Sequence, residues 1–238
     1  MKDAFKSNCL LCGEQLIYYT ETRLLACAVC RHEFHSEASC EQGHFICNSC
    51  HSTSANEMIE KICIKSDSRK PVQLAIDLIK APSISMHGPE HHFLVPAVLL
   101  TAFYNQKGDA QQKEKKIKVA RQRADNVLGG FCGFYGACGA GVGTGIFISL
   151  VTDTTPLSAE TWGLSNQMTA ESLRCTGALD GPRCCKRDTF MSLKTARKFL
   201  KQKMDIMLDI PNTITCNFNE FNKECIEENC PFHAKEIV

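Results

Sequence analysis

Residues 129–145 of this chain read GGFCGFYGACGAGVGTG and lead directly into the apolar segment 146–151. Eight glycines in this stretch allow the backbone to adopt positive φ angles or to approach a neighbouring element closely. A dinucleotide-binding loop of similar composition follows a strand, whereas a basic, helical pattern at 108–128 precedes this one. We therefore interpret the stretch as the start of a buried helix that packs closely against other helices, which makes the chain mainly helical.

Two cysteines, Cys132 and Cys138, stand in the loop before this expected helix. A thiol at a helix N-terminus has a lowered pKa, which favours thiolate chemistry or metal binding. The surrounding glycines would let the helix start close to both sulfur atoms. We expect the loop to form the floor of a sulfur- or metal-binding site, with both thiols as ligands of an iron–sulfur cluster or of zinc, or as nucleophiles.

Cysteine is the unusual feature of the composition, with 16 among 238 residues. The start of the chain, MKDAFKSNCLLC, has no apolar segment of the kind that directs export, and no apolar run is long enough to span a bilayer. We therefore expect a reducing cytoplasm, where cysteines serve as metal ligands or reactive groups rather than disulfides. The net charge of +1 and the lack of aromatic residues among the lysines of 108–128 argue against nucleic acid and membrane partners.

Residues 9–51 carry cysteine pairs at the two-residue spacing of zinc-binding knuckles. A module this short cannot bury enough apolar surface to fold alone, so bound metal would supply the missing stability. We expect a zinc-ribbon-like module in which zinc is structural. Its predicted ligands are Cys9, Cys12, Cys27, Cys30, Cys40, His44, Cys47 and Cys50.

The spacing leaves the pairing of these ligands open. In a sequential arrangement, the first two cysteine pairs share one zinc ion and the later four ligands share the second. In a cross-braced arrangement, the first pair joins Cys40 and His44, and the second pair joins Cys47 and Cys50. The segment 43–51, GHFICNSCH, resembles part of a RING finger, but no further C-x2-C pair follows it. We therefore favour the sequential arrangement and do not expect a ubiquitin ligase.

Composition divides the chain into three parts. We expect a metal-binding module at 1–52, a linker helix at 53–70 that ends in the polar segment KSDSRK, and a helical, cysteine-rich domain at 71–238. Apolar residues recur at helical spacing in 72–79 and again in 190–208. The third part carries the candidate site.

The segment 87–92, HGPEHH, puts three imidazoles and a carboxylate at the start of an apolar helix. Such groups are costly to bury, and they are useful in proton transfer or metal binding. We expect Glu90 and His91 to act in catalysis. The alternative is a capped surface turn with solvated histidines.

The segment 181–187, GPRCCKR, places Cys184 and Cys185 among three cations. Nearby positive charge favours the thiolate form, so we expect both cysteines to act as nucleophiles or ligands, with a redox switch as an alternative. Lys186 and Arg187 are predicted to bind an anionic substrate or cofactor. We expect the loops at 87–92, 132–138 and 184–187 to converge, because loops that carry such groups between apolar helices usually meet at a site.

The tail carries Cys216, Cys225 and Cys230, and a proline follows the last of them. A Cys-Pro pair often ends the ligand run of an iron–sulfur cluster, although this spacing is not that of a ferredoxin. We favour a 4Fe-4S cluster here over a zinc knot completed by His233 and over unliganded thiols. The fourth position would stay open or be filled by Cys132, Cys138, Cys184 or Cys185.

Four segments together resemble an uncharacterised cysteine-rich domain family of anaerobic bacteria and archaea: HGPEHH, GGFCGFYGACGAGVGTGIF, GPRCCKR and the closing NKEC…CPF. The resemblance covers most of residues 70–233, and a cysteine-rich head commonly accompanies that family. It implies a metal- or sulfur-related role in anaerobic metabolism, beside a partner enzyme of the methyltransferase or radical-SAM type. The chain itself has no C-x3-C-x2-C run for a radical-SAM cluster, so neither partner's activity is transferred to it.

Two hypotheses about function stay open on the sequence. The first is an enzyme that holds an iron–sulfur cluster or another metal and handles a sulfur, one-carbon or redox group. The second is a non-catalytic, zinc-stapled adaptor of a partner enzyme. Iron and acid-labile sulfide in the purified protein would distinguish the two.

Overall fold

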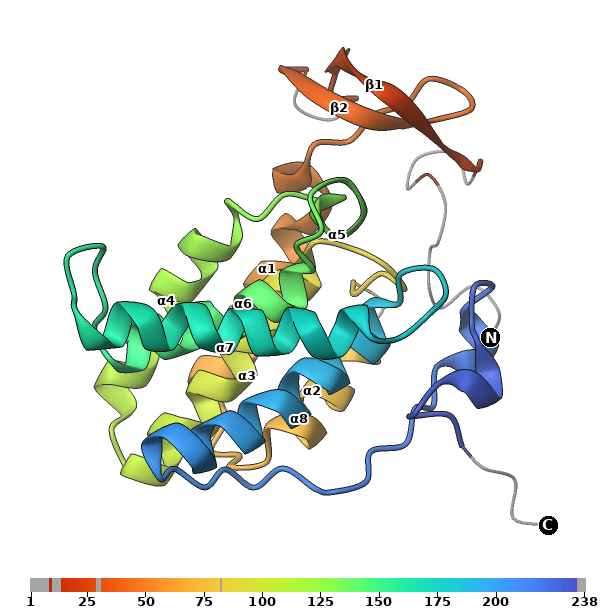
Figure 1. Cartoon of the computed structure of the whole chain (residues 1–238). Helices are drawn as coiled ribbons and strands as arrows, with labels where there is room; N and C mark the ends of the chain where they lie inside the picture. The colour runs from red at the N-terminus through yellow and green to blue at the C-terminus, as the bar shows by residue number, and fades with distance from the viewer. Residues whose placement is uncertain (1–8, 10–13, 29–30, 82, 235–238) are drawn as a thin grey trace.

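The computed structural model describes residue 9 and residues 14–28, 31–81 and 83–234. Within these ranges an antiparallel hairpin forms a small head above a body of helices (Figure 1). The mainly helical fold predicted from the sequence is confirmed. The elements in chain order are β1 (Leu16–Ala26), β2 (Glu33–Cys40), α1 (Asn48–Lys65), α2 (Pro71–Ile79), α3 (Glu90–Lys107), α4 (Ala110–Ala124), α5 (Phe131–Phe134), α6 (Gly139–Val151), α7 (Glu160–Gly177) and α8 (Cys185–Met204).

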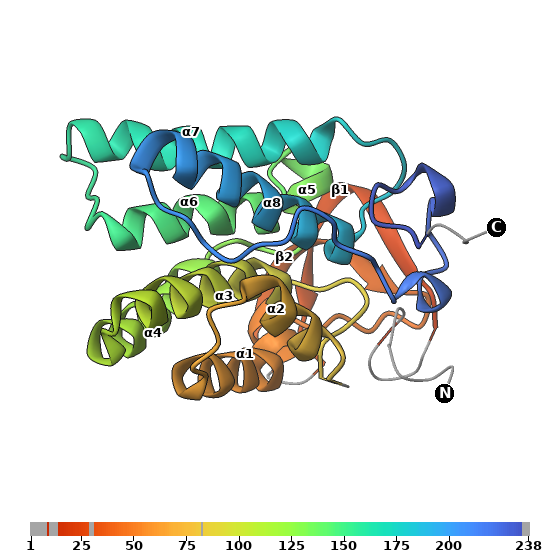
Figure 2. The ribbon, with the colours of Figure 1, turned by 90° about the horizontal axis from the view of Figure 1, so that it is seen from below.

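Helix α3 lies at the centre of the body and is apolar on all sides. Every residue from Phe93 to Tyr104 is buried, so this helix has no face that water can cover. A helix of this kind needs protein on every side, and α1, α2, α4, α6 and α8 all contact it. Figure 2 shows α3 between a layer formed by α1 and α2 and a layer formed by α6, α7 and α8. No helix in the described ranges is long and apolar enough to cross a membrane.

The glycine-rich stretch forms helix α6, which starts at Gly139 as predicted. A Cβ atom on Gly143 would lie 2.8 Å from Pro96 Cδ and 2.9 Å from the carbonyl oxygen of His92, both in α3. On the other side of α6, a Cβ atom on Gly145 would lie 1.9 Å from Thr169 Oγ1 in α7. The glycines therefore let α6 pack closely between α3 and α7.

Helix α1 connects the head to the body and packs as part of the body. It runs without a break from Asn48 to Lys65 and so crosses the boundary predicted at residue 52. Ala55, Ile59 and Cys63 on this helix belong to the common apolar core. Helix α1 therefore packs with the body, and the division into 1–52, 53–70 and 71–238 stays a prediction.

The lysines of α4 hold helices together. Lys113 Nζ donates hydrogen bonds to the carbonyl oxygen of Ser66 at 2.9 Å and to Asn105 Oδ1 at 2.8 Å. Lys116 forms an ion pair with Asp153, just after the end of α6. Both lysines are buried, so these two ammonium groups tie α4 to the end of α1 and to the α6–α7 connection.

The chain after α8 has little regular structure. Residues 205–234 contain two single turns of 3-10 helix, Asn219–Phe221 and Glu227–Asn229. Within this tail, the amide of Cys216 donates to the carbonyl oxygen of Phe232 at 2.6 Å. The Phe232 ring packs edge-on against Phe190 of α8, with ring centroids 5.6 Å apart. The tail therefore folds back beside the N-terminal half of α8.

The close contact of α6 with α3 predicts opposite effects for two glycine substitutions. Gly143→Ala should lower the free energy of unfolding by about 1–3 kcal/mol, because its new methyl group meets backbone and a proline ring. The matched control is Gly163→Ala in α7, where the nearest heavy atom to a Cβ is 4.0 Å away. That change should raise stability by roughly 0.5–1 kcal/mol. Chemical denaturation followed by circular dichroism measures both, and equal effects would contradict the packing described.

Candidate metal centres

Two groups of three ligands form in the head. The ligand atoms of Cys9, Cys40 and His44 all lie within 4.8 Å of one another. The same holds for Cys27, Cys47 and Cys50. Backbone amides face two of the sulfurs, since His44 N lies 3.3 Å from Cys40 Sγ and Cys47 N lies 3.3 Å from Cys27 Sγ. Each triad could hold a metal ion.

The hairpin explains why these ligands group in the cross-braced way. The start of β1 pairs with the end of β2, which brings Cys9 beside Cys40. A parallel bridge between Cys27 and Phe45 brings the end of β1 to the segment before α1. The sequential pairing that we favoured on spacing is therefore wrong for the described ligands. The two remaining predicted ligands, Cys12 and Cys30, lie outside the described residues.

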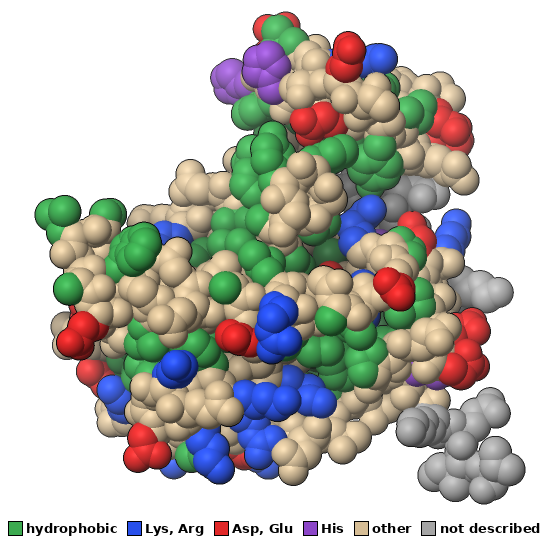
Figure 3. All heavy atoms as spheres, in the orientation of Figure 1, with side chains coloured by type: hydrophobic (Ala, Val, Ile, Leu, Met, Phe, Trp, Pro, Cys, Tyr) green, Lys and Arg blue, Asp and Glu red, His purple; other side chains and the backbone are tan. Residues whose placement is uncertain are grey.

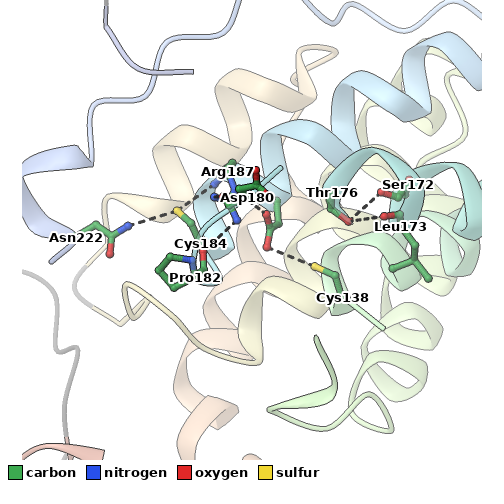
Figure 4. A network of polar contacts seen from close by, with 10 residues as sticks. Cys138, Ser172, Leu173, Thr176, Asp180, Pro182, Cys184, Arg187 and Asn222 are labelled. Carbon is green, nitrogen blue, oxygen red and sulfur yellow. Dashed lines mark hydrogen bonds and ion pairs between the residues drawn. The ribbon is translucent and has the colours of Figure 1, made fainter. Parts of the chain in front are cut away.

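Four cysteines of the body and tail line a single hollow beside the N-terminus of α8. They are Cys184, Cys216, Cys225 and Cys230. Cys184 is the N-cap residue of α8, and the other three come from the tail. Asn222 Nδ2 lies 3.6 Å from Cys184 Sγ, which links the tail to the start of the helix (Figure 4). The structure thus brings the predicted tail ligands together and adds Cys184 to them.

Cys138 belongs to a different contact. Its sulfur lies 3.7 Å from Asp188 Oδ2 in the first turn of α8. Burial, together with the nearby Asp188 carboxylate, raises the pKa of the Cys138 thiol to about 12. The residues that line the tail hollow include neither Cys132 nor Cys138. The loop 132–138 therefore meets α8 as predicted, but on another side of the helix from the tail thiols.

Burial outweighs the neighbouring cations in setting the protonation of the adjacent cysteines. It raises the pKa of Cys184 and that of Cys185. The Lys186 ammonium group lowers the pKa of Cys185, but by less than burial raises it. The expectation that the cations alone would turn either thiol into a thiolate is therefore wrong. A directly bound metal ion is the kind of charge that could deprotonate such thiols.

Lys186 and His91 lie at the centre of a buried polar cluster. Lys186 Nζ lies 3.1 Å from His91 Nε2 and donates to the carbonyl oxygen of Ser85. The amide of Ser85 donates to Glu90 Oε1 at 2.7 Å, so one residue connects the carboxylate to the ammonium group. Glu90 and His91 are each only 1% exposed, which excludes the solvated surface turn. Burial lowers the pKa of Lys186 to about 8, and it lowers the pKa of His91 well below its ordinary range.

Arg187 holds the loop before α8 in place. Its guanidinium group donates to Asp188 Oδ1 at 3.2 Å, to the Asp180 carbonyl at 3.3 Å and to the Pro182 carbonyl at 3.1 Å. These acceptors belong to its own loop and helix. The anion-binding role of Lys186 and Arg187 stays a prediction, and the local contacts of Arg187 do not favour it.

Asn222 organises the tail, although it belongs to none of the sequence motifs described above. Its side chain is buried, and Asn222 Oδ1 lies 3.1 Å from His87 Nε2, where it accepts a hydrogen bond when that nitrogen carries the proton. The same oxygen accepts a hydrogen bond from the amide of Glu224 at 3.2 Å, and Glu224 Oε2 lies 2.8 Å from His87 Nε2. An asparagine three residues before Cys225 can form such a turn. That local pattern was the available signal.

The buried imidazole of His91 predicts how stability depends on pH. Its lowered pKa means that the unfolded chain binds a proton there below the ordinary value of 6.5 while the folded protein does not. Stability should therefore fall as the pH drops through that value. His91→Gln keeps a hydrogen-bond acceptor for Lys186 but removes the titrating imidazole. When the pH is lowered, we therefore expect the free energy of unfolding to fall less in this variant than in the wild type.

Denaturant titrations between about pH 8 and pH 5.5 test this linkage. His35→Gln is the matched control, because His35 is exposed on β2. The plot of unfolding free energy against pH for His35→Gln should run parallel to that of the wild type. A His91→Gln profile parallel to both would show that His91 is not held neutral in the folded protein.

Comparisons with known proteins place the helical domain in a family. No curated protein matches the chain. No solved structure matches it either. Residues 59–233 match a family whose description is a family of unknown function (DUF5714). This range includes the polar cluster and the tail hollow and leaves out the head triads. Because the match covers most of the chain, the protein belongs to the DUF5714 family.

Proposed function

We propose that this chain is a metal-dependent enzyme whose head holds two structural zinc ions and whose tail holds a 4Fe-4S cluster. The pair of head triads carries the proposal, because each brings three ligand atoms within 4.8 Å of one another. A tetrahedral zinc ion, with Zn–S distances of about 2.3 Å, places its sulfur ligands roughly 3.8 Å apart. The remaining cysteine of each C-x2-C pair, Cys12 or Cys30, would complete the set of four.

The head needs a metal for stability. An isolated two-stranded hairpin is marginally stable in water, and most side chains of β1 and β2 are exposed or half-buried. The buried residues of the head include its ligands Cys9, Cys27, Cys40 and Cys47. Zinc bound to these thiolates would take the place of the missing apolar core.

The tail thiols are arranged differently from those of the head. Within the described part of the chain, only the head triads bring three ligand atoms within 4.8 Å of one another. The four cysteines of the tail hollow line one space but do not meet that limit as a group. A 4Fe-4S cluster binds each cysteine to a different iron and so holds the sulfurs farther apart than one zinc ion does. This difference supports a cluster over a zinc knot with His233.

The polar cluster supports an enzyme that moves protons or electrons beside the tail. Lys186, His91 and Glu90 are buried together within the family domain. When bound, the iron–sulfur cluster of the tail would supply one-electron chemistry. The side chains of the polar cluster could hold or pass on a proton. Together with the resemblance to anaerobic proteins, this supports a role for the enzyme with a sulfur, one-carbon or redox group, beside a partner of the methyltransferase or radical-SAM type.

Metal analysis after anaerobic purification tests the proposal. We expect about two zinc ions per chain in tetrahedral thiolate sites, and about four iron atoms with matching acid-labile sulfide. Cys40→Ser should lower the zinc content and unfold the head, because Cys40 is buried at a ligand position. Cys175→Ser is the matched control, since Cys175 lies half-buried on α7, and it should leave all metals unchanged. Protein that folds fully without zinc would contradict the role of the head.

The adaptor hypothesis has one specific observation in its favour. The hairpin exposes the apolar side chains of Leu16, Ile17, Tyr18, Leu24 and Phe34, and Figure 3 shows apolar surface on the head and on the body below it. If the chain is an adaptor, Leu24→Glu should abolish function in cells, while Cys184→Ser should leave it intact and the protein should contain zinc alone. If the chain is an enzyme, Leu24→Glu should leave function intact and Cys184→Ser should abolish it. The protein should then contain iron as well as zinc.

A further inference from the structure

The neighbouring residues Cys184 and Cys185 have different surroundings, although the sequence gives them the same neighbours. Cys184 is the N-cap of α8, with extended backbone angles of φ −138° and ψ 102°. Its sulfur lines the hollow together with the three tail thiols. Cys185 is the first residue of the helix and does not line that hollow, and the charges that influence its thiol are those of Lys186, Asp188 and Cys138. The turn into α8 thus sends one sulfur to the tail and the other to the body.

The four sulfurs of the hollow match the number of ligands that one iron–sulfur cluster takes. Cys184 comes from the start of α8, and Cys216, Cys225 and Cys230 come from the tail. A 4Fe-4S cluster is held by four cysteine thiolates. The rest of the lining includes the side chains of Met86, Phe218 and Asn222.

Amide donors point at these sulfurs, as they do in metal–thiolate sites. The Arg187 amide lies 3.5 Å from Cys184 Sγ, and the Glu227 amide lies 3.4 Å from Cys225 Sγ. The side-chain amide of Asn222 adds a third donor, 3.6 Å from Cys184 Sγ. Hydrogen bonds of this kind stabilise bound thiolate and tune the potential of a cluster.

We propose that Cys184 is the fourth protein ligand of the tail metal centre, together with Cys216, Cys225 and Cys230. This inference rests on the tail centre of the proposed function, and it assigns the position that the sequence left open among four candidates. The number of protein ligands also decides whether the metal centre can bind a substrate. With four thiolates from the protein, no iron is left open for a substrate, so the cluster transfers electrons or holds the tail in place.

A ligand from α8 would also explain how the tail is held. Residues 205–234 have only two short turns of their own, and Cys184 is the one ligand of the four that belongs to the helical body. The metal would then link the tail to α8 as a disulfide would, beside the packing of Phe232 on Phe190. Loss of the Cys184 ligand should therefore loosen the tail as well as change the metal.

The test compares Cys184→Ser with Cys185→Ser in the full chain, expressed with iron and sulfide supply and purified without oxygen. Serine still caps a helix, so the start of α8 should be preserved. For the wild type we expect about four iron atoms per chain, and for Cys184→Ser about three or none. After anaerobic oxidation with ferricyanide, we also expect the electron paramagnetic resonance signal of an oxidised three-iron cluster in any Cys184→Ser protein that retains iron. Cys185→Ser should keep the wild-type iron, sulfide and spectrum.

A second variant and a second readout cover the case in which Cys184→Ser folds poorly. Cys184→Asp retains both an N-cap oxygen and a possible ligand, so it should keep more iron than Cys184→Ser. Limited proteolysis should cut the tail of Cys184→Ser faster than that of Cys185→Ser. Circular dichroism confirms that the helices of each variant are intact.

The outcomes separate this inference from the proposed function. Wild-type metal and spectrum in Cys184→Ser, or equal losses in Cys185→Ser, would overturn the role of Cys184 while leaving the cluster. A wild type without iron but with a third zinc ion that Cys184→Ser loses would overturn the cluster and support Cys184 as a ligand. A wild type with zinc in the head alone and no iron would overturn both.

Discussion

The burial of residues 93–104 of α3 is the constraint on which the rest of the structure depends. Because residues 93–104 have no polar face, helices must cover this element on all sides. The polar residues at its N-terminus, Glu90 and His91, are then buried with it and need partners inside the protein. Ser85 and Lys186 provide them. A buried charge without a partner would be strongly destabilising. The first turn of α8, which carries Lys186, therefore lies beside the N-terminus of α3. Apolar packing of one helix therefore positions the polar cluster.

In the proposed function, metal–thiolate sites stabilise the two ends of the chain, whereas apolar packing stabilises the helical body. The head is a hairpin with exposed faces, and its buried residues include four of the six ligands in its two triads. The tail has two short turns and a hollow lined by cysteines. Among the described residues of the head, the buried apolar side chains are those of its cysteines, whereas the tail also adds residues such as Ile214 and Phe218 to the common core. Helices α1 and α8 both belong to the body. Ligands at the start of each helix, Cys47 and Cys184, would let metal ions extend the ordered structure outward from the helical core.

The sequence predicted what depends on local pattern and missed what depends on long-range packing. Helical periodicity and the change at Gly139 predicted a mainly helical fold and the start of α6, since both are properties of one segment. C-x2-C spacing identified ligands but not their pairing, which the register of the hairpin decides. The protonation of Cys185 was misjudged for a similar reason. Adjacent cations are visible in a sequence, but the desolvation that outweighs them arises only when other elements cover the residue.

The loops at 87–92 and 132–138 and the tail all contact the start of α8, each through a different residue. Lys186 reaches His91 in the loop at the start of α3. Asp188 contacts Cys138 at the start of α6. Cys184 faces the tail through Asn222. A helical turn presents successive residues about 100° apart, so a short run can contact three separate elements only if they surround it. Cys184, Lys186 and Asp188 stand close together in the sequence because each of them contacts a different neighbouring segment.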